Sequence, residues 1–205
     1  MNVADTFSAM RPDDVRPLAT LHRIAFPGFF LTALGEPFLV QLYRGYLADP
    51  TAVTVVARSA DRSIRGAVIG TTEPAGFFGR LLKRQWPGLV LASARAVLTR
   101  PSSTPRLLRA VRYRGDTPPG VEGALLSSIC VEAGARGEGV GGQLVDAWVR
   151  EVRRRGLQSA FLMTDADDND AVNGFYGRHG WVLDERYITH EGRLMNRYTI
   201  SLADL

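Results

Sequence analysis

The chain of 205 residues has few residues of several types, and each shortage excludes a class of protein. Cys130 is its only cysteine, so no intramolecular disulfide can form, and we expect a cytoplasmic protein. No apolar run reaches the roughly 18 residues of a membrane-spanning helix, and the N-terminal residues lack the pattern of a secretory signal. The histidines His22, His179 and His190 lie too far apart to suggest a metal site. We therefore expect no metal ion and no integral membrane segment.

The remaining composition is that of a folded globular protein. Hydrophobic residues make up 45% of the chain and charged residues 22%. Residues 1–205 are therefore expected to form a single domain with one proper core. The net charge is +4, and Lys83 is the only lysine among 25 basic residues. All the others are arginines, and the planar guanidinium binds phosphate and carboxylate groups through paired hydrogen bonds better than the lysine ammonium does.

An apolar run followed by a glycine-rich turn is the most informative stretch. Leu125–Val131 has the length and composition of a buried strand, and five residues separate it from Gly137. Gly137, Gly139 and the pair that ends at Gly142 then lead into a helix. Glycines let backbone N–H groups approach an anion, and a helix N-terminus favours negative charge. The stretch predicts a cradle for a pyrophosphate.

A glycine-rich loop of this kind has three other interpretations. Gly137-x-Gly139-x-x-Gly142 also fits the dinucleotide fingerprint, but that loop begins close to its strand and lies in a repeated βαβ unit. Only about 60 residues follow the loop here. A nucleotide-triphosphate loop needs a lysine after the glycines, and none is present. The remaining alternative is an ordinary glycine-rich turn, which a second motif makes less attractive.

The second motif begins at Asn169 and ends at Trp181. Asn169 is suited to cap a helix, and Gly180 is suited to end it before a new strand begins. Four residues of the motif are spaced to share one helical face: Val172, Phe175, Tyr176 and His179.

Together, the two motifs resemble those of the GCN5-related N-acetyltransferase (GNAT) family in their order and separation. The family's second motif has Phe-Tyr-x-x-x-Gly-Phe where this chain has Phe175-Tyr176-x-x-x-Gly180-Trp181. The resemblance covers about residues 124–186 firmly and extends loosely to the start of the chain. It implies an α/β fold with a mixed, mostly antiparallel sheet flanked by helices. Its fourth and fifth strands would be parallel and splay apart to admit acetyl-coenzyme A.

The resemblance also implies a set of cofactor-binding residues. The loop amides would hold the pyrophosphate, and Arg136 would steady the loop or touch a phosphate. Main-chain groups of the fourth strand would pair with the pantetheine arm, and the N–H of Val131 would be the oxyanion donor. Asn169 would hydrogen-bond the arm, and the hydroxyl of Tyr176 would act as the general acid. The full set is Ile129, Cys130, Val131, Arg136, Gly137, Glu138, Gly139, Val140, Gly141, Gly142, Asn169 and Tyr176.

Acetyl transfer to an amine also needs a base that takes the proton from the amine. Glu73, Glu132 and Asp165 each follow or end an expected strand. Glu73 is the first choice, because strand ends in this fold face the acceptor cleft. An ordered chain of water molecules, which the family often uses, is the alternative. The expected catalytic residues are therefore Tyr176 and Glu73.

The expected elements follow the order of the family's fold. Strands are predicted at 5–11, 51–57, 64–72, 125–131, 159–164, 181–186 and 194–201, and helices near 13–24 and 36–48. A helical insertion is expected over about 74–118, between the third and fourth strands. Pro87 and the Pro101–Pro105 stretch should divide it into three short helices.

This insertion is strongly basic. From Pro74 to Gly115 there is no acidic residue but nine basic ones: Arg80, Lys83, Arg84, Arg95, Arg100, Arg106, Arg109, Arg112 and Arg114. Solvated helix faces are one explanation. An electropositive wall that attracts an anionic substrate is a second, and attachment to nucleic acid or an anionic membrane is a third. The insertion could equally pack against a second copy of the chain, which would give a homodimer.

The sequence therefore predicts an acetyl-CoA-dependent N-acetyltransferase that acts on a primary amine of a small, anionic substrate. The Phe26-Pro-x-x-Phe30 and Leu34-Gly-x-x-Phe38 patterns resemble acetyltransferases of sugar-biosynthesis clusters, which favours an amino sugar, free or nucleotide-linked. A protein or peptide amine is the enzymatic alternative. A non-catalytic CoA-binding sensor, with a basic segment for nucleic acid or membrane, is the other. Nucleic acid is not a favoured partner, because no ordered aromatic–basic repeat is present.

Overall fold

The computed structural model describes residues 5–28, 30–99, 121–189 and 192–203. The strands along these residues are β1 (Thr6–Ser8), β2 (Ala52–Arg58), β3 (Ile64–Thr71), β4 (Ala124–Val131), β5 (Ser159–Asp165), β6 (Val182–Ile188) and β7 (Leu194–Ser201). The helices are α1 (Val15–Ala25), α2 (Phe30–Ala33), α3 (Glu36–Ala48), α4 (Phe77–Thr99), α6 (Val140–Arg154) and α7 (Asp170–Arg178). Two short 3₁₀ turns are η1 (Pro12–Asp14) and η3 (Ala133–Ala135).

The strands form one seven-stranded sheet in the order β1-β2-β3-β4-β5-β7-β6. Neighbouring strands are antiparallel except for β4 and β5, which are parallel. The mixed, mostly antiparallel sheet that the resemblance implied is therefore confirmed. β4 and β5 pair only at Ala124↔Ala160 and Leu125↔Phe161, so the two strands separate beyond these residues.

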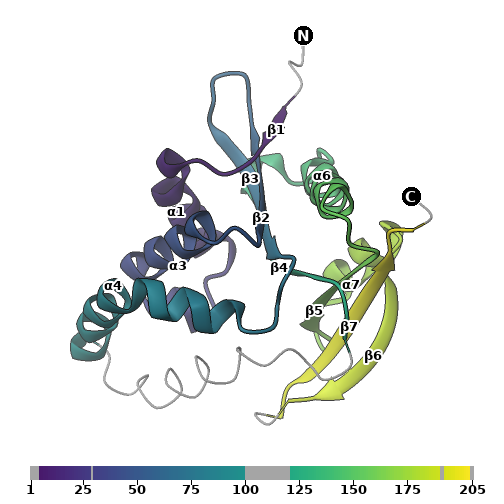
Figure 1. The fold of residues 1–205 in the computed structure, drawn as a ribbon. Coiled ribbons are helices and arrows are strands. Elements are labelled where there is room, and N and C mark those ends of the chain that lie inside the picture. Colours follow the sequence, from purple (N-terminus) through teal and green to yellow (C-terminus); the bar gives the residue numbers. More distant parts are fainter. Residues whose placement is uncertain (1–4, 29, 100–120, 190–191, 204–205) are drawn as a thin grey trace.

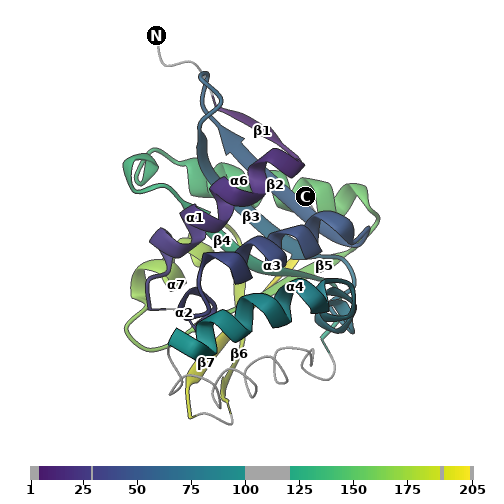
Figure 2. The same ribbon diagram turned by 90° about the vertical axis from the view of Figure 1, so that its left-hand side faces the viewer.

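Helices cover both faces of this sheet (Figures 1 and 2). The α1 face is covered by α1, α3 and α4, around a hydrophobic core that includes Leu18, Leu39 and Phe77. The α6 face is covered by α6 and α7, around a second core that includes Leu144 and Trp148. The sheet therefore has a buried core on each side.

A single tryptophan fixes α6 on the sheet. The indole N–H of Trp148 donates to the carbonyl of Val53 on β2 at 3.1 Å, and the ring is fully buried. A Cβ at Gly70 would lie 2.6 Å from this ring, so glycine at that position lets the indole lie against β3. The first turn of α6 is thereby held near the end of β4.

Most predicted boundaries are confirmed to within one or two residues, and α3 begins and ends where the apolar stripe predicted. The first strand is shorter than predicted, because β1 covers only Thr6–Ser8. The chain then leaves the sheet, where the amide of Met10 donates to Thr54 Oγ1 at 3.2 Å and η1 begins after Arg11. The short helix α2 was not predicted, since its residues have the composition of a hydrophobic turn.

The predicted break at Pro87 is wrong, because α4 continues through this proline. Proline removes one backbone donor and crowds the preceding turn. Close packing on α3 accompanies this exception: a Cβ at Gly88 would lie 2.6 Å from Gln41, and one at Gly45 would lie 2.4 Å from Leu81. The rest of the predicted insertion, residues 100–118, lies outside the described residues.

The α3–α4 contact gives a matched pair of predictions. Gly45→Ala should lower the free energy of unfolding by ~1–3 kcal/mol, because the buried Leu81 side chain would have to move. A Cβ at Gly79 on α4 would meet no described atom within 4 Å, so Gly79→Ala should stabilise by up to ~1 kcal/mol through helix propensity. Denaturant titration of both variants measures this, and equal shifts would contradict the close packing of α3 on α4.

Candidate active site

The candidate site begins where β4 and β5 part. Beyond Leu125 and Phe161 no register pair joins these two fully described strands, so the β4 edge that faces the gap has no ladder partner. The amide of Glu132 donates to the carbonyl of Arg65 at 2.8 Å, which fixes the phase of the β3–β4 ladder. Along an antiparallel ladder, successive residues direct their N–H and C=O groups alternately toward the partner strand and away from it. Ile129 and Val131 therefore direct their N–H and C=O groups into the gap.

Cys130, between these two residues, directs its main-chain N–H and C=O groups toward β3 instead. Its register partner is Ala67, and the alternation directs its main-chain groups toward that strand. Its side chain is buried in the core of the α1 face, and burial raises the pKa of the thiol to about 11. The structure therefore does not bring Cys130 into the arm-binding set, and a protonated, enclosed thiol is no nucleophile.

The glycine-rich loop leads from β4 through η3 into α6. Gly137 (φ 84°) and Gly139 (φ 81°) both have left-handed backbone, which side chains of other residues disfavour. Within the described residues, no backbone carbonyl accepts from the amides of Val140, Gly141 or Gly142. Unpaired N–H groups at a helix start, together with the helix dipole, favour an anion. The loop therefore fits the pyrophosphate predicted for it.

The last glycines of the loop also bring α7 to the start of α6. A Cβ at Gly142 would lie 2.4 Å from the ring of His179, and one at Gly141 would lie 3.6 Å from the ring of Phe175. The Nδ1 atom of His179 is 3.8 Å from Asp146 Oδ1 on α6. The same glycine pattern that exposes amides thus allows the helix that carries Tyr176 to pack beside the cradle.

Two charged side chains of the loop have opposite surroundings. Arg136 is exposed and has no ion-pair partner among the described side chains, so its guanidinium can reach a phosphate. Glu138 would repel a phosphate, but its carboxylate pairs with Arg65 on β3. The hydrogen bond to Glu138 and the charge of Asp5, 3.5 Å away, raise the pKa of the Arg65 guanidinium. Arg65, which the sequence analysis missed, therefore neutralises the acidic side chain of the cradle.

Tyr176 lies in an aromatic cluster on α7. Its ring centroid is 5.2 Å from that of Phe175, and 6.0 Å from those of Trp181 and Tyr198. The residue is 5% exposed, and burial raises the pKa of its phenol above the usual value. No group in the described part of the chain hydrogen-bonds its hydroxyl. A phenol that stays protonated and has no acceptor among the described residues suits the predicted general acid.

Asn173, one helical turn before Tyr176, fastens α7 to the sheet. Its Nδ2 donates to the carbonyl of Asp165 at 3.1 Å. Its Oδ1 accepts from Asn196 Nδ2 at 3.1 Å and from the Tyr198 hydroxyl at 3.2 Å. This residue was also missed, although the i, i+4, i+7 spacing of Asn169, Asn173 and Tyr176 places all three on one helical face.

Asn169 is the N-cap residue of α7, but its side chain makes no capping hydrogen bond. Its Nδ2 donates instead to Thr164 Oγ1 at 2.5 Å and to the carbonyl of Asp165 at 3.0 Å. No described group donates to its Oδ1. That oxygen is therefore available to accept a hydrogen bond from a ligand.

The three candidate bases have different surroundings. Asp165 is held by Arg193, whose guanidinium donates to its two carboxylate oxygens at 2.6 and 2.7 Å. Glu73 is 66% exposed, and its carboxylate is 3.8 Å from Arg80. Glu132 is exposed and is the residue before η3. Of the three, Asp165 is the one committed to a close ion pair.

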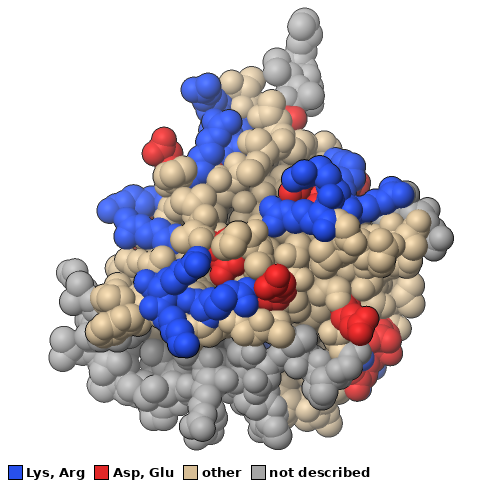
Figure 3. All heavy atoms as spheres, in the orientation of Figure 1, with Lys and Arg blue, Asp and Glu red and all other residues tan. Residues whose placement is uncertain are grey.

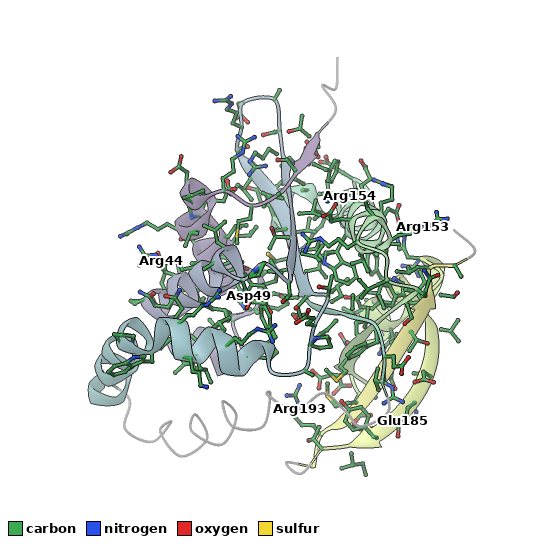
Figure 4. All side chains as sticks on the ribbon, viewed as in Figure 1. Arg44, Asp49, Arg153, Arg154, Glu185 and Arg193 are labelled. Carbon is green, nitrogen blue, oxygen red and sulfur yellow. The ribbon has the colours of Figure 1, made fainter. Side chains whose placement is uncertain are left out.

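Two arginines of the basic segment hold α4 in place. Arg80 Nε donates to the buried carboxylate of Asp49 at 3.2 Å, and Arg84 donates to the carbonyl of Ala48 at 2.7 Å. Burial acts to raise the pKa of Asp49, but hydrogen bonds from Thr51 and Arg80 outweigh it and lower that pKa. Figure 4 shows Asp49 where α3, α4 and the sheet meet. Two of the nine basic residues in the predicted electropositive wall, Arg80 and Arg84, therefore stabilise the packing of α4 on α3.

The other basic side chains of this segment are Lys83, which is exposed, and six arginines. The side chains of those six (Arg95, Arg100, Arg106, Arg109, Arg112 and Arg114) lie outside the described part of the chain. Figure 3 shows Lys and Arg side chains gathered over the α3–α4 end of the molecule and, separately, over α6. The described residues contain no group of three acidic, histidine or cysteine side chains that could hold a metal ion. Their helices include none long and apolar enough to cross a bilayer.

Comparison with known proteins agrees with this geometry. Residues 20–181 match the model of the acetyltransferase (GNAT) family. A search of curated proteins found no match. The solved structure of SsHAT superposes with a TM-score of 0.71 at 17% identity, covering 98% of this chain and 100% of that one.

Two further solved structures share the fold. A spermidine N-acetyltransferase chimera from Vibrio cholerae and hSSAT has a TM-score of 0.62 at 13% identity, with 98% of each chain covered. The NatC complex, solved with Gag peptide and CoA, has a TM-score of 0.57 at 13% identity, with 97% of this chain and 99% of that one covered. At these identities the likeness concerns the fold.

Tyr176→Phe tests the acid. Removal of the hydroxyl should lower kcat by ~10²-fold or more, while the affinity for CoA stays within about twofold. Because the pKa of the phenol is raised, the wild-type rate should show no loss from tyrosine ionisation below about pH 10. Tyr43→Phe is the control, since it removes a hydroxyl that pairs with His22 and should cost stability rather than rate. An unchanged kcat in Tyr176→Phe would remove this residue as the acid.

The Arg65–Glu138 pair is tested by a double-mutant cycle on CoA affinity, measured by calorimetry. Arg65→Gln leaves the Glu138 carboxylate unpaired beside the pyrophosphate and should weaken binding about fivefold. Glu138→Gln should bind CoA as tightly as the wild type or more tightly, and the double variant should return to within about twofold of wild type. Additive losses in the double variant would contradict the neutralising role of Arg65.

Proposed function

Because the chain belongs to the GNAT acetyltransferase family and is an acetyl-CoA-dependent N-acetyltransferase, we propose that its acceptor is a primary amine of a small molecule. An amino sugar, free or linked to a nucleotide, is the favoured class. A protein or peptide amine is the alternative, which the NatC structure, solved with Gag peptide and CoA on a similar fold, supports.

The residues present fit acetyl-CoA, which supplies the acetyl group as a thioester. The amides of Val140, Gly141 and Gly142, together with Arg136, would hold the pyrophosphate. The outward main-chain groups of Ile129 and Val131 and the Oδ1 of Asn169 would hold the arm. Unpaired amides at the start of α6 and along the open edge of β4, both within the described residues, support this assignment.

Tyr176 would give its proton to the departing thiolate, since its phenol is protonated and has no described internal acceptor. The N–H of Val131 would stabilise negative charge on the carbonyl oxygen. The N–H of Ile129 has the same orientation and lies further from the cradle, about 7 Å along β4, so it is the alternative donor for this oxygen. Glu73 remains the proposed base, with ordered water as the alternative, because Asp165 is already committed to Arg193.

The position of α4 is the observation that supports a small acceptor. The cradle lies at the start of α6, so the amine must reach the gap from the other face of the sheet, the α1 face. α4 adds a helix of 23 residues to that face and packs along α3. Its fastening by Arg80 and Arg84 leaves less room for an extended peptide than for a compact molecule.

The charge on α4 supports an anionic acceptor. Lys83 is exposed and has no ion-pair partner among the described residues, and Arg84 bonds a neutral carbonyl rather than a carboxylate. Within the described part of the chain, both charges therefore remain uncompensated by an acidic side chain. The positive electrostatic potential of these two side chains favours the approach of a phosphate-bearing substrate.

The acceptor is tested by incubating the enzyme with acetyl-CoA and one amine at a time, with thiol release and product mass as readouts. The panel contains glucosamine, a nucleotide-linked amino sugar, spermidine and a peptide with a free N-terminus. We expect the highest kcat/KM for the nucleotide-linked amino sugar, and a larger rise in KM for it than for glucosamine in Lys83→Ala. Turnover of the peptide alone would reject the small-molecule acceptor and leave the transferase assignment intact.

A further inference from the structure

β4 contains one extra residue at the point where the gap opens. Ile69 pairs with Ser128, and the next residue of β3, Gly70, pairs with Leu126. Ser127 is therefore the bulged residue, with no partner of its own on β3, a strand described along its whole length. It lies two residues beyond Leu125, the last residue of β4 that pairs with β5. Bulges redirect side chains and are common beside active sites.

The bulge directs its serines away from α6. Leu126 and Ile129 both pack in the core of the α6 face, three residues apart instead of the even spacing of a regular strand. The two residues between them therefore turn toward the α1 face. Ile69, which pairs with Ser128, belongs to the core of that face and confirms the direction.

The hydroxyl of Ser127 is enclosed and has no hydrogen-bond partner among the described residues. Ser159, at the start of the neighbouring strand β5, shows the usual arrangement, since its hydroxyl donates to the carbonyl of Glu122 at 3.1 Å. An enclosed hydroxyl without a partner costs free energy, so its presence at a functional gap calls for a ligand. The residue itself is part-exposed, and a rotation about its Cα–Cβ bond can turn the oxygen toward the gap.

We propose that Ser127 Oγ donates a hydrogen bond to the acetyl carbonyl oxygen of bound acetyl-CoA. Along β4, Val131, Ile129 and Ser127 lie at increasing distance from the cradle, and the thioester is the end of the cofactor furthest from its pyrophosphate. A carbonyl oxygen accepts the hydrogen bond that the hydroxyl lacks, and it gains negative charge during transfer. Ser127 would thus add a side-chain donor beside the amide of Ile129, because the amide of Val131 lies four residues, about 13 Å, along β4 and cannot reach the same oxygen. The proposal depends on acetyl-CoA as donor and not on which amine is the acceptor.

Calorimetric titration of Ser127→Ala with acetyl-CoA and with CoA tests the proposal without any acceptor. We expect the affinity for acetyl-CoA to fall about five- to tenfold, the effect of one lost hydrogen bond, and the affinity for CoA to stay within about twofold. Ser127→Cys, which keeps the size of the side chain and has a weaker donor, should show the same selective loss.

Thermal unfolding of the ligand-free variants supplies a second readout. Ser127→Ala removes a hydroxyl that has no described partner and should leave the midpoint unchanged or raise it. The matched control, Ser159→Ala, breaks a hydrogen bond and should lower the midpoint while both affinities stay at wild-type values. Equal affinities of wild type and Ser127→Ala for acetyl-CoA, or an equal loss for both ligands, would overturn the proposal. Wild-type protein that binds neither ligand would instead overturn the cofactor assignment itself.

Discussion

The early end of pairing between β4 and β5 is the constraint on which the rest of the site depends. Two register pairs hold these strands together at Leu125 and the residue before it, and beyond them each strand relies on its other neighbour. A strand edge inside a sheet is normally paired, because unpaired backbone groups are costly. Here the edge of β4 is left for a ligand that can bond like a strand. Ile129 and Val131 offer the groups, and Cys130 keeps β4 attached to β3.

The helices of the α6 face turn this gap into a binding site. Trp148 fixes α6 to β2, and the glycines at its start leave amides that favour an anion. Asn173 fixes α7, the helix that carries Tyr176, to β5 and β7. Each helix is therefore held by a side chain that bonds the sheet, and this bonding orients both the acid and the amides.

Local patterns in the sequence predicted much of this arrangement. The apolar stripe of α3, the glycine spacing before α6 and the Tyr176 motif act over a few residues, so the sequence carries them directly. The shortened β1 and the unbroken helix at Pro87 depend on tertiary contacts, with Thr54 and with α3, which no local pattern records. Local propensity was overridden by packing in both cases.

Contacts between distant residues could not be predicted in the same way. Arg65 and Glu138 are 73 residues apart, and neither carries a motif that names the other. The bulge at Ser127 follows from the register of β3 and β4, which one strand's sequence does not reveal. Asn173 is different, because its helical spacing from Tyr176 is visible in the sequence. Its role could not be predicted without knowing that Asn196 and Tyr198 of β7 bond its side chain.

The most direct test of the account is amide hydrogen exchange, read residue by residue by NMR, with and without CoA. The account predicts that the amides of Ile129, Val131 and Val140–Gly142 exchange fast in the free protein and become protected when CoA binds. The amide of Cys130 should be protected in both states, because it faces β3. CoA binding that leaves Ile129 and Val131 unprotected, or that changes Cys130 alone, would contradict the central claim that the open edge of β4 receives the cofactor.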